Sequence, residues 1–129
     1  MSVEQIIAAG NRGHADRQGP SNNKLRCADG FTVSVIAGGG TYCTPRPRLC
    51  VPRFGECPLP ADKALGEVEC TYPGPYAAVE VGFPSERPEP WTEWQEFADD
   101  RSDDGTDVVY GFVPVGLVRH LIAAHGGEA

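Results

Sequence analysis

The sequence predicts a small α+β domain, in which an antiparallel sheet of three to five strands carries a C-terminal helix packed on one face. Three observations support this fold class. Several segments alternate apolar and polar residues with the period of a strand. The last segment of the chain has an apolar stripe at helical spacing. The length of 129 residues suits one domain spanning residues 1–129.

The first part of the chain predicts a helix followed by a hairpin. Residues 3–9 form a short helix between a serine cap and a glycine stop. Residues 24–27 and 31–37 are predicted strands joined by an Asp-Gly turn. The residues of the second strand that are expected to face the core are Phe31, Val33, Val35 and Ala37.

A long Pro/Cys-rich stretch interrupts the pattern over residues 44–75, which are predicted to be an irregular loop or insertion. It contains seven prolines. Because proline fixes φ and removes a ladder donor, this density disfavours a sheet. Structureless loops of such length are usually functional or variable.

The second half of the chain predicts two further strands and two helices. Residues 76–83 and 107–113 are predicted strands, residues 91–98 a short acidic helix, and residues 115–125 the final helix. The expected core comprises Val33, Val35, Val79, Val81, Phe83, Phe112, Leu117, Leu121 and Ile122.

Charge is distributed unevenly along the chain, and the net charge is −7. Residues 1–60 carry seven Lys and Arg against four Asp and Glu, whereas residues 61–129 carry four against fourteen. An acidic total does not favour a nucleic-acid partner, because phosphate neutralisation drives that binding. The sequence has no run of about 18 consecutive apolar residues, so no membrane span is predicted. The N-terminal residues do not have the pattern of a secretory signal.

No catalytic motif is found, and the sequence predicts no catalytic residue, no cofactor and no metal. Phosphate-loop and nucleophile-elbow patterns are missing from the sequence. Its five cysteines contain no short Cys-x2-4-Cys pair of the kind that binds zinc. A weaker alternative stays open, in which the long loop wraps a metal with Cys43, Cys50, Cys57 and Cys70.

The acidic tract at residues 86–107 is the first candidate surface, with nine carboxylates against two arginines. Such a surface can imitate the charge of a nucleic-acid backbone and occupy a basic groove on a host protein, with tryptophans as anchors. The alternative is a solvated loop with the tryptophans in the core. The candidate partner-binding residues are Trp91, Trp94, Glu96, Asp99, Asp100, Asp103 and Asp104.

A glycine-rich turn with nearby arginines is the second candidate surface. Bare glycine backbone can approach an anion, and guanidinium groups suit phosphate. The alternative is a flexible turn beside solvated charges. The candidate anion or nucleotide pocket consists of Gly38, Gly39, Gly40, Tyr42, Arg46 and Arg48.

Four blocks, at residues 24–31, 40–46, 74–84 and 109–114, resemble small uncharacterised accessory proteins of tailed phages and prophages of high-GC Gram-positive bacteria. Residues 50–70 look like an insertion relative to them. The family has no assigned catalytic residues. The resemblance implies a phage accessory or virion protein made in the host bacterial cytoplasm.

Together these observations predict a non-enzymatic protein that binds or inhibits, stoichiometrically, a host factor such as one of anti-phage defence, or the small signalling ligand of that factor. The alternative is a virion structural protein, such as a capsid decoration or connector subunit. The sequence leaves the oligomeric state open.

Overall fold

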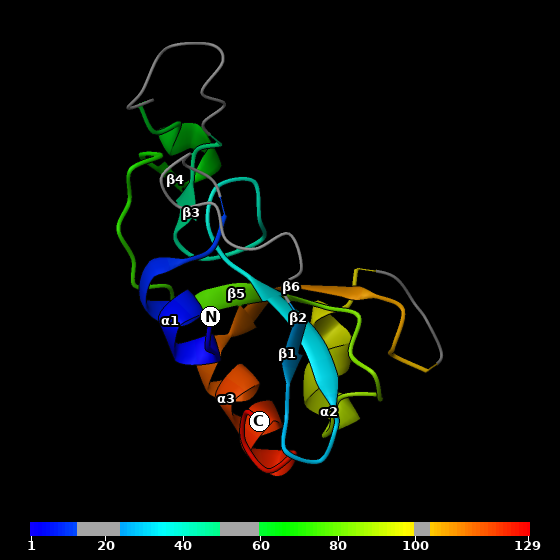
Figure 1. Cartoon of the computed structure of the whole chain (residues 1–129). Helices are drawn as coiled ribbons and strands as arrows, with labels where there is room; N and C mark the ends of the chain where they lie inside the picture. The colour runs from blue at the N-terminus through cyan, green and yellow to red at the C-terminus, as the bar shows by residue number, and fades with distance from the viewer. Residues whose placement is uncertain (13–23, 50–59, 100–103) are drawn as a thin grey trace.

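A four-stranded antiparallel sheet in the order β1-β2-β5-β6 is the frame of the molecule (Figure 1). The computed structural model describes residues 1–12, 24–49, 60–99 and 104–129. The strands of the sheet are β1 (Lys24–Arg26), β2 (Thr32–Ile36), β5 (Ala78–Gly82) and β6 (Val109–Pro114).

The helices cover one face of this sheet, which confirms the predicted α+β fold class. Their buried side chains join a single cluster with the inward residues of the strands, among them the paired Val35 and Val81. The final helix packs on the sheet as predicted, through Val118 and Leu121. The helices are α1 (Val3–Ala9), α2 (Trp91–Trp94), α3 (Val115–Ala124) and the 3-10 helix η4 (Gln95–Phe97).

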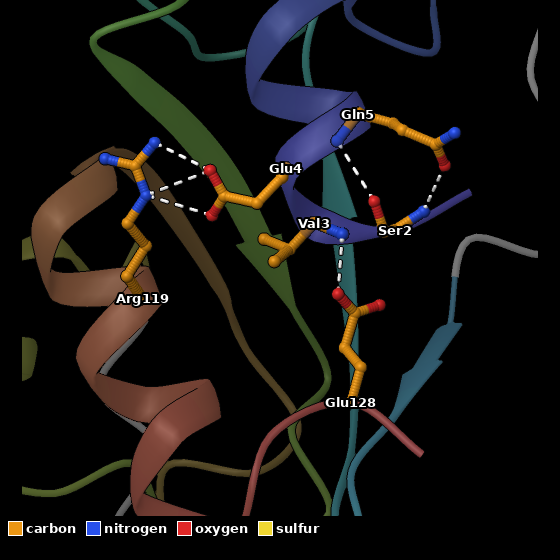
Figure 2. A network of polar contacts seen from close by, with 6 residues as sticks. All are labelled: Ser2, Val3, Glu4, Gln5, Arg119 and Glu128. Atoms are coloured by element: carbon orange, nitrogen blue, oxygen red, sulfur yellow. Dashed lines mark hydrogen bonds and ion pairs between the residues drawn. The ribbon is translucent and has the colours of Figure 1, made fainter.

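Helix α1 forms where the sequence predicts it, and it is tied to the end of the chain. Ser2 and Gln5 make a reciprocal capping box at its start. Glu4 accepts hydrogen bonds from Arg119 of α3, with a shortest distance of 2.8 Å between Oε1 and Nη2 (Figure 2). A carboxylate oxygen of Glu128 accepts the backbone N–H of Val3 at 3.0 Å. The first helix is therefore fixed to both the last helix and the C-terminal residues.

The predicted irregular loop at residues 44–75 is not confirmed over its described part. Two short strands, β3 (Arg46–Pro47) and β4 (Glu67–Val68), pair in parallel, and a 3-10 helix, η3 (Lys63–Leu65), precedes the second. Residues 50–59 lie outside the described residues. This small sheet sits at the end of the molecule opposite the C-terminus (Figure 1).

Both outer edges of the main sheet are partly covered by other backbone. Beside β1, the N–H of Ala129 donates to Arg26 O at 2.8 Å. Beside β6, the N–H of Asp99 donates to Val109 O at 2.9 Å, and the N–H of Phe112 donates to Tyr42 O at 2.9 Å. The chain thereby uses its own segments to satisfy edge groups that would otherwise face solvent.

Two residues of the expected core, Phe83 and Phe112, are on the surface, with 48% and 46% of their area exposed. Both have positive φ, 51° and 54°. Phe112 lies in a β-bulge, and Phe83 follows the end of β5, so regular alternation fails at both positions. Leu117 is half-buried against the core, and the other expected core residues are buried.

Truncating the core should destabilise the protein strongly. We expect Val81→Ala and Leu121→Ala each to lower the free energy of unfolding by about 2–4 kcal/mol, because both leave a cavity among buried neighbours. Leu65 is 68% exposed and provides the control. Leu65→Ala should change the free energy of unfolding by less than about 0.5 kcal/mol. Urea denaturation measures all three variants. Core variants that are as stable as Leu65→Ala would contradict the described packing.

Candidate functional site

A pocket of about 400 Å³ opens beside β6 and contains residues from both surfaces that the sequence predicted. Tyr42 comes from the predicted anion pocket, whereas Glu96 and Asp99 come from the predicted acidic surface. We call this site the aromatic pocket. Its lining residues are Tyr42, Glu96, Phe97, Asp99, Gly111 and Phe112.

A β-bulge turns Phe112 toward this pocket. Val79 pairs with Val113 and Val81 pairs with Tyr110, so Glu80 of β5 faces two residues of β6. The extra residue lets both Tyr110 and Val113 point to the core. Phe112, with φ of 54°, is directed outward instead. A left-handed conformation at a bulky residue is strained, and such strain concentrates at functional sites.

Tyr42 is held over the bulge by its backbone. Its carbonyl accepts the N–H of Phe112 at 2.9 Å, and its own N–H donates to Oε1 of Glu80 at 3.0 Å. A Cβ on Gly111 would lie 3.2 Å from the Cβ of Tyr42, so glycine permits this close approach. The Tyr42 and Phe112 rings lie 5.7 Å apart and are each about half exposed. The two aromatic walls are thus positioned by backbone contacts.

The opposite wall is fixed to β6 through the core. Trp94 packs edge-on against Tyr110, with ring centroids 5.4 Å apart, and both side chains are fully buried. Directly after Trp94 comes η4, which contributes Glu96 and Phe97 to the pocket. Asp99 then joins β6, because its Oδ1 accepts the N–H of Val109 at 3.3 Å. The carboxylates of Glu96 and Asp99 therefore belong to a segment that is held against β6 by these contacts.

The burial of Trp94 corrects one prediction. Trp94 has no exposed area, so it cannot serve as an anchor on a partner-binding surface, and the alternative of a core tryptophan holds for it. Trp91 is half-buried, and the guanidinium carbon of Arg87 lies 5.4 Å from its ring centroid. Asp104 is exposed and accepts the N–H of Thr106. Asp100 and Asp103 lie outside the described residues.

The glycine turn has a structural role in the fold. Gly38, with φ of 131°, packs so closely that a Cβ would lie 1.9 Å from the carbonyl oxygen of Arg12. Its own carbonyl accepts bonds from the N–H and hydroxyl of Thr41, and its N–H donates to Sγ of Cys43 at 3.4 Å. Gly39 is buried and Gly40 is exposed. The turn thus positions Tyr42, which follows it.

The two arginines of the predicted anion pocket point to different partners. The guanidinium carbon of Arg46 lies 5.5 Å from the ring centroid of Tyr42. Arg48 forms a 4.0 Å ion pair with Glu67 and donates to Pro60 O. The structure therefore brings Tyr42 and Arg46 together and directs Arg48 toward the small parallel sheet.

The cysteines that the structure describes are buried thiols. Burial raises the pKa of Cys43, and also that of Cys27. Cys70 is buried as well, whereas Cys50 and Cys57 lie outside the described residues. Within the described ranges, no group of three or more His, Cys, Asp or Glu side chains is placed to hold a metal ion.

Sequence reasoning missed Phe97, Gly111 and Phe112 as pocket residues. The alternating pattern predicts Phe112 in the core, because such a pattern does not reveal a bulge. The glycine before it was the available signal, since glycine inside a strand often marks a bulge or a close backbone approach. A second pocket, of about 520 Å³ between α2 and α3, is lined by Pro90, Glu93, Gly116, Leu117 and His120.

Tyr110, behind the aromatic pocket, should make stability fall at high pH. Burial of its hydroxyl, together with the negative charge of Asp104, raises the pKa of Tyr110 to about 12. The unfolded chain therefore loses this proton first, so the stabilisation is complete below about pH 10 and is lost as the pH rises to about 12. The expected loss is about 2–3 kcal/mol.

Urea denaturation at a series of pH values, compared with Tyr110→Phe, measures this contribution. The variant lacks the ionising hydroxyl, so its stability should fall less steeply over the same interval. Parallel curves for the two proteins would contradict the role of Tyr110.

Over the described residues, no helix has the length and apolar character needed to cross a bilayer. Comparison of the chain with protein-family models, with curated proteins and with solved structures finds no match.

Proposed function

We propose that this chain is a non-enzymatic binding protein that acts stoichiometrically on a host protein, through the aromatic pocket. The observation that carries the proposal is the pair of half-exposed aromatic side chains, Tyr42 and Phe112, held in place around a strained bulge. We further propose, on the resemblance of its sequence blocks alone, a phage or prophage accessory protein acting in the host bacterial cytoplasm.

The energetics of Phe112 support a binding role. A non-glycine residue in the left-handed region costs about 1–3 kcal/mol, and its exposed ring contributes little burial in return. Glycine suits such a backbone position best. Phe83 has a similar φ and a similar exposure, and what distinguishes Phe112 is that its ring lines the pocket. Contact with a partner would recover the apolar area that the free protein leaves in water. Aromatic residues held in this way are typical of interface hot spots.

The composition of the lining also suits a binding surface. The lining side chains that the structure describes are aromatic or acidic. An apolar centre with a polar rim is the usual composition of a protein interface.

Two matched substitutions test the proposal. Phe112→Gly removes the pocket ring but places glycine where φ is positive, so its melting temperature should stay within a few degrees of the wild type. Phe83→Gly removes a ring of similar exposure at a similar φ, outside the pocket. We expect Phe112→Gly to weaken partner binding at least about tenfold, and Phe83→Gly to leave it unchanged.

The measurement is quantitative affinity capture from a susceptible bacterial host, followed by native mass spectrometry of the complex with the main captured protein. We expect a complex of fixed stoichiometry, which the Phe83→Gly variant also forms. Equal capture by both variants would show that the pocket is not the interface. Assembly of the protein into large homo-oligomers, with no captured partner, would favour the virion structural alternative.

A further inference from the structure

We propose that the aromatic pocket binds an arginine side chain presented by the partner protein. This inference rests on the proposed function and specifies the chemistry of the group that enters the site. It is supported by the charge of the rim, by the aromatic walls and by the geometry that joins them.

The rim of the pocket is negatively charged and selects a cation. Glu96 and Asp99 are both exposed, and among the residues that the structure describes no Lys, Arg or His lines the pocket. Asp99 is further oriented by Val109, whose N–H donates to its Oδ1. A cation entering the pocket therefore meets two carboxylates, and the guanidinium of Arg46 lies nearby, over the Tyr42 ring.

The walls of the pocket suit a flat cation. Tyr42, Phe97 and Phe112 supply aromatic surface, to which guanidinium groups are attracted through the negative ring faces. The chain itself makes such a contact at this place, since Arg46 lies over the Tyr42 ring and yet does not line the pocket. A second guanidinium group would thus meet a ring system that already binds one.

Arginine fits this combination better than lysine. Its planar guanidinium stacks on aromatic rings and presents several N–H donors, which can reach two carboxylates at once. It is also less strongly hydrated than an ammonium group, so its transfer to an apolar wall is easier. The volume of about 400 Å³ lies in the range that accommodates a small ligand.

The second pocket offers a contrast within the same molecule. Among the residues that the structure describes, its lining has one carboxylate, Glu93, and the imidazole of His120, with no other aromatic ring. It therefore lacks both the paired carboxylates and the aromatic walls. Glu93 precedes Glu96 by three residues and is also exposed, which makes it a matched control for the removal of charge.

The experiment titrates the ¹⁵N-labelled protein with N-acetyl-arginine-N-methylamide and follows amide chemical shifts. The corresponding citrulline derivative, which has nearly the same shape without the charge, is the control probe. We expect saturable shifts centred on Gly111 and Phe112 with the arginine probe, and at least threefold weaker binding of citrulline. Shifts that are equal for both probes, or that lie away from the pocket, would overturn the inference.

Charge variants complete the test. The double substitution Glu96→Gln and Asp99→Asn should weaken binding of the arginine probe about three- to tenfold, since each exposed ion pair contributes modestly. The side-chain amide introduced by Asp99→Asn keeps an acceptor for the N–H of Val109, so the wall should remain in place. Glu93→Gln should bind the probe as the wild type does. Equal affinity of the double variant and the wild type would overturn the inference.

The two proposals can fail separately. If Phe112→Gly loses the captured protein while the double charge variant keeps it fully, the binding function stands and the arginine inference fails. If Phe112→Gly keeps the partner, the proposed function itself fails. Sedimentation equilibrium tests a second copy as the occupant: self-association that Phe112→Gly abolishes would overturn the assignment to a partner's arginine.

Discussion

The structure depends most on the bulge that sets two residues of β6 against Glu80 of β5. In a regular ladder, Tyr110 and Val113 would point to opposite faces, and one of them would leave the core. The bulge lets both enter it, where Tyr110 meets Trp94. It also releases the N–H of Phe112 to the carbonyl of Tyr42. One irregularity therefore determines the core packing, the position of the loop and the shape of the pocket.

The sequence pattern predicts correctly those elements that are determined by residues close to one another in the chain. The cap of α1, the inward face of β2 and the apolar stripe of α3 follow from neighbouring residues, and the structure has all three. The bulge could not be predicted in this way, because register depends on pairing between strands distant in sequence. The pairing of β3 with β4 has the same origin, as it joins residues about twenty positions apart.

The candidate site illustrates the same limit. Tyr42, Glu96 and Phe112 belong to three distant segments, and the sequence placed the first two in separate surfaces. These segments meet at the pocket because the Trp94 and Tyr110 rings pack together in the core. That contact holds η4 beside β6. The sequence predicts Trp94 on the partner-binding surface, whereas the structure places it in the core beneath that surface. A braced pocket loses little conformational freedom on binding, which favours affinity.

The covered sheet edges have a consequence for crowded solutions. An open strand invites another chain to extend the sheet, which is the first step of many aggregates. Here the C-terminal backbone lies beside β1, while Asp99 and Tyr42 engage groups along β6. Neighbouring molecules thus find some of the ladder positions on the described edges already occupied. At those positions another chain can make contact only through side chains, which discriminate between partners more than a backbone ladder does.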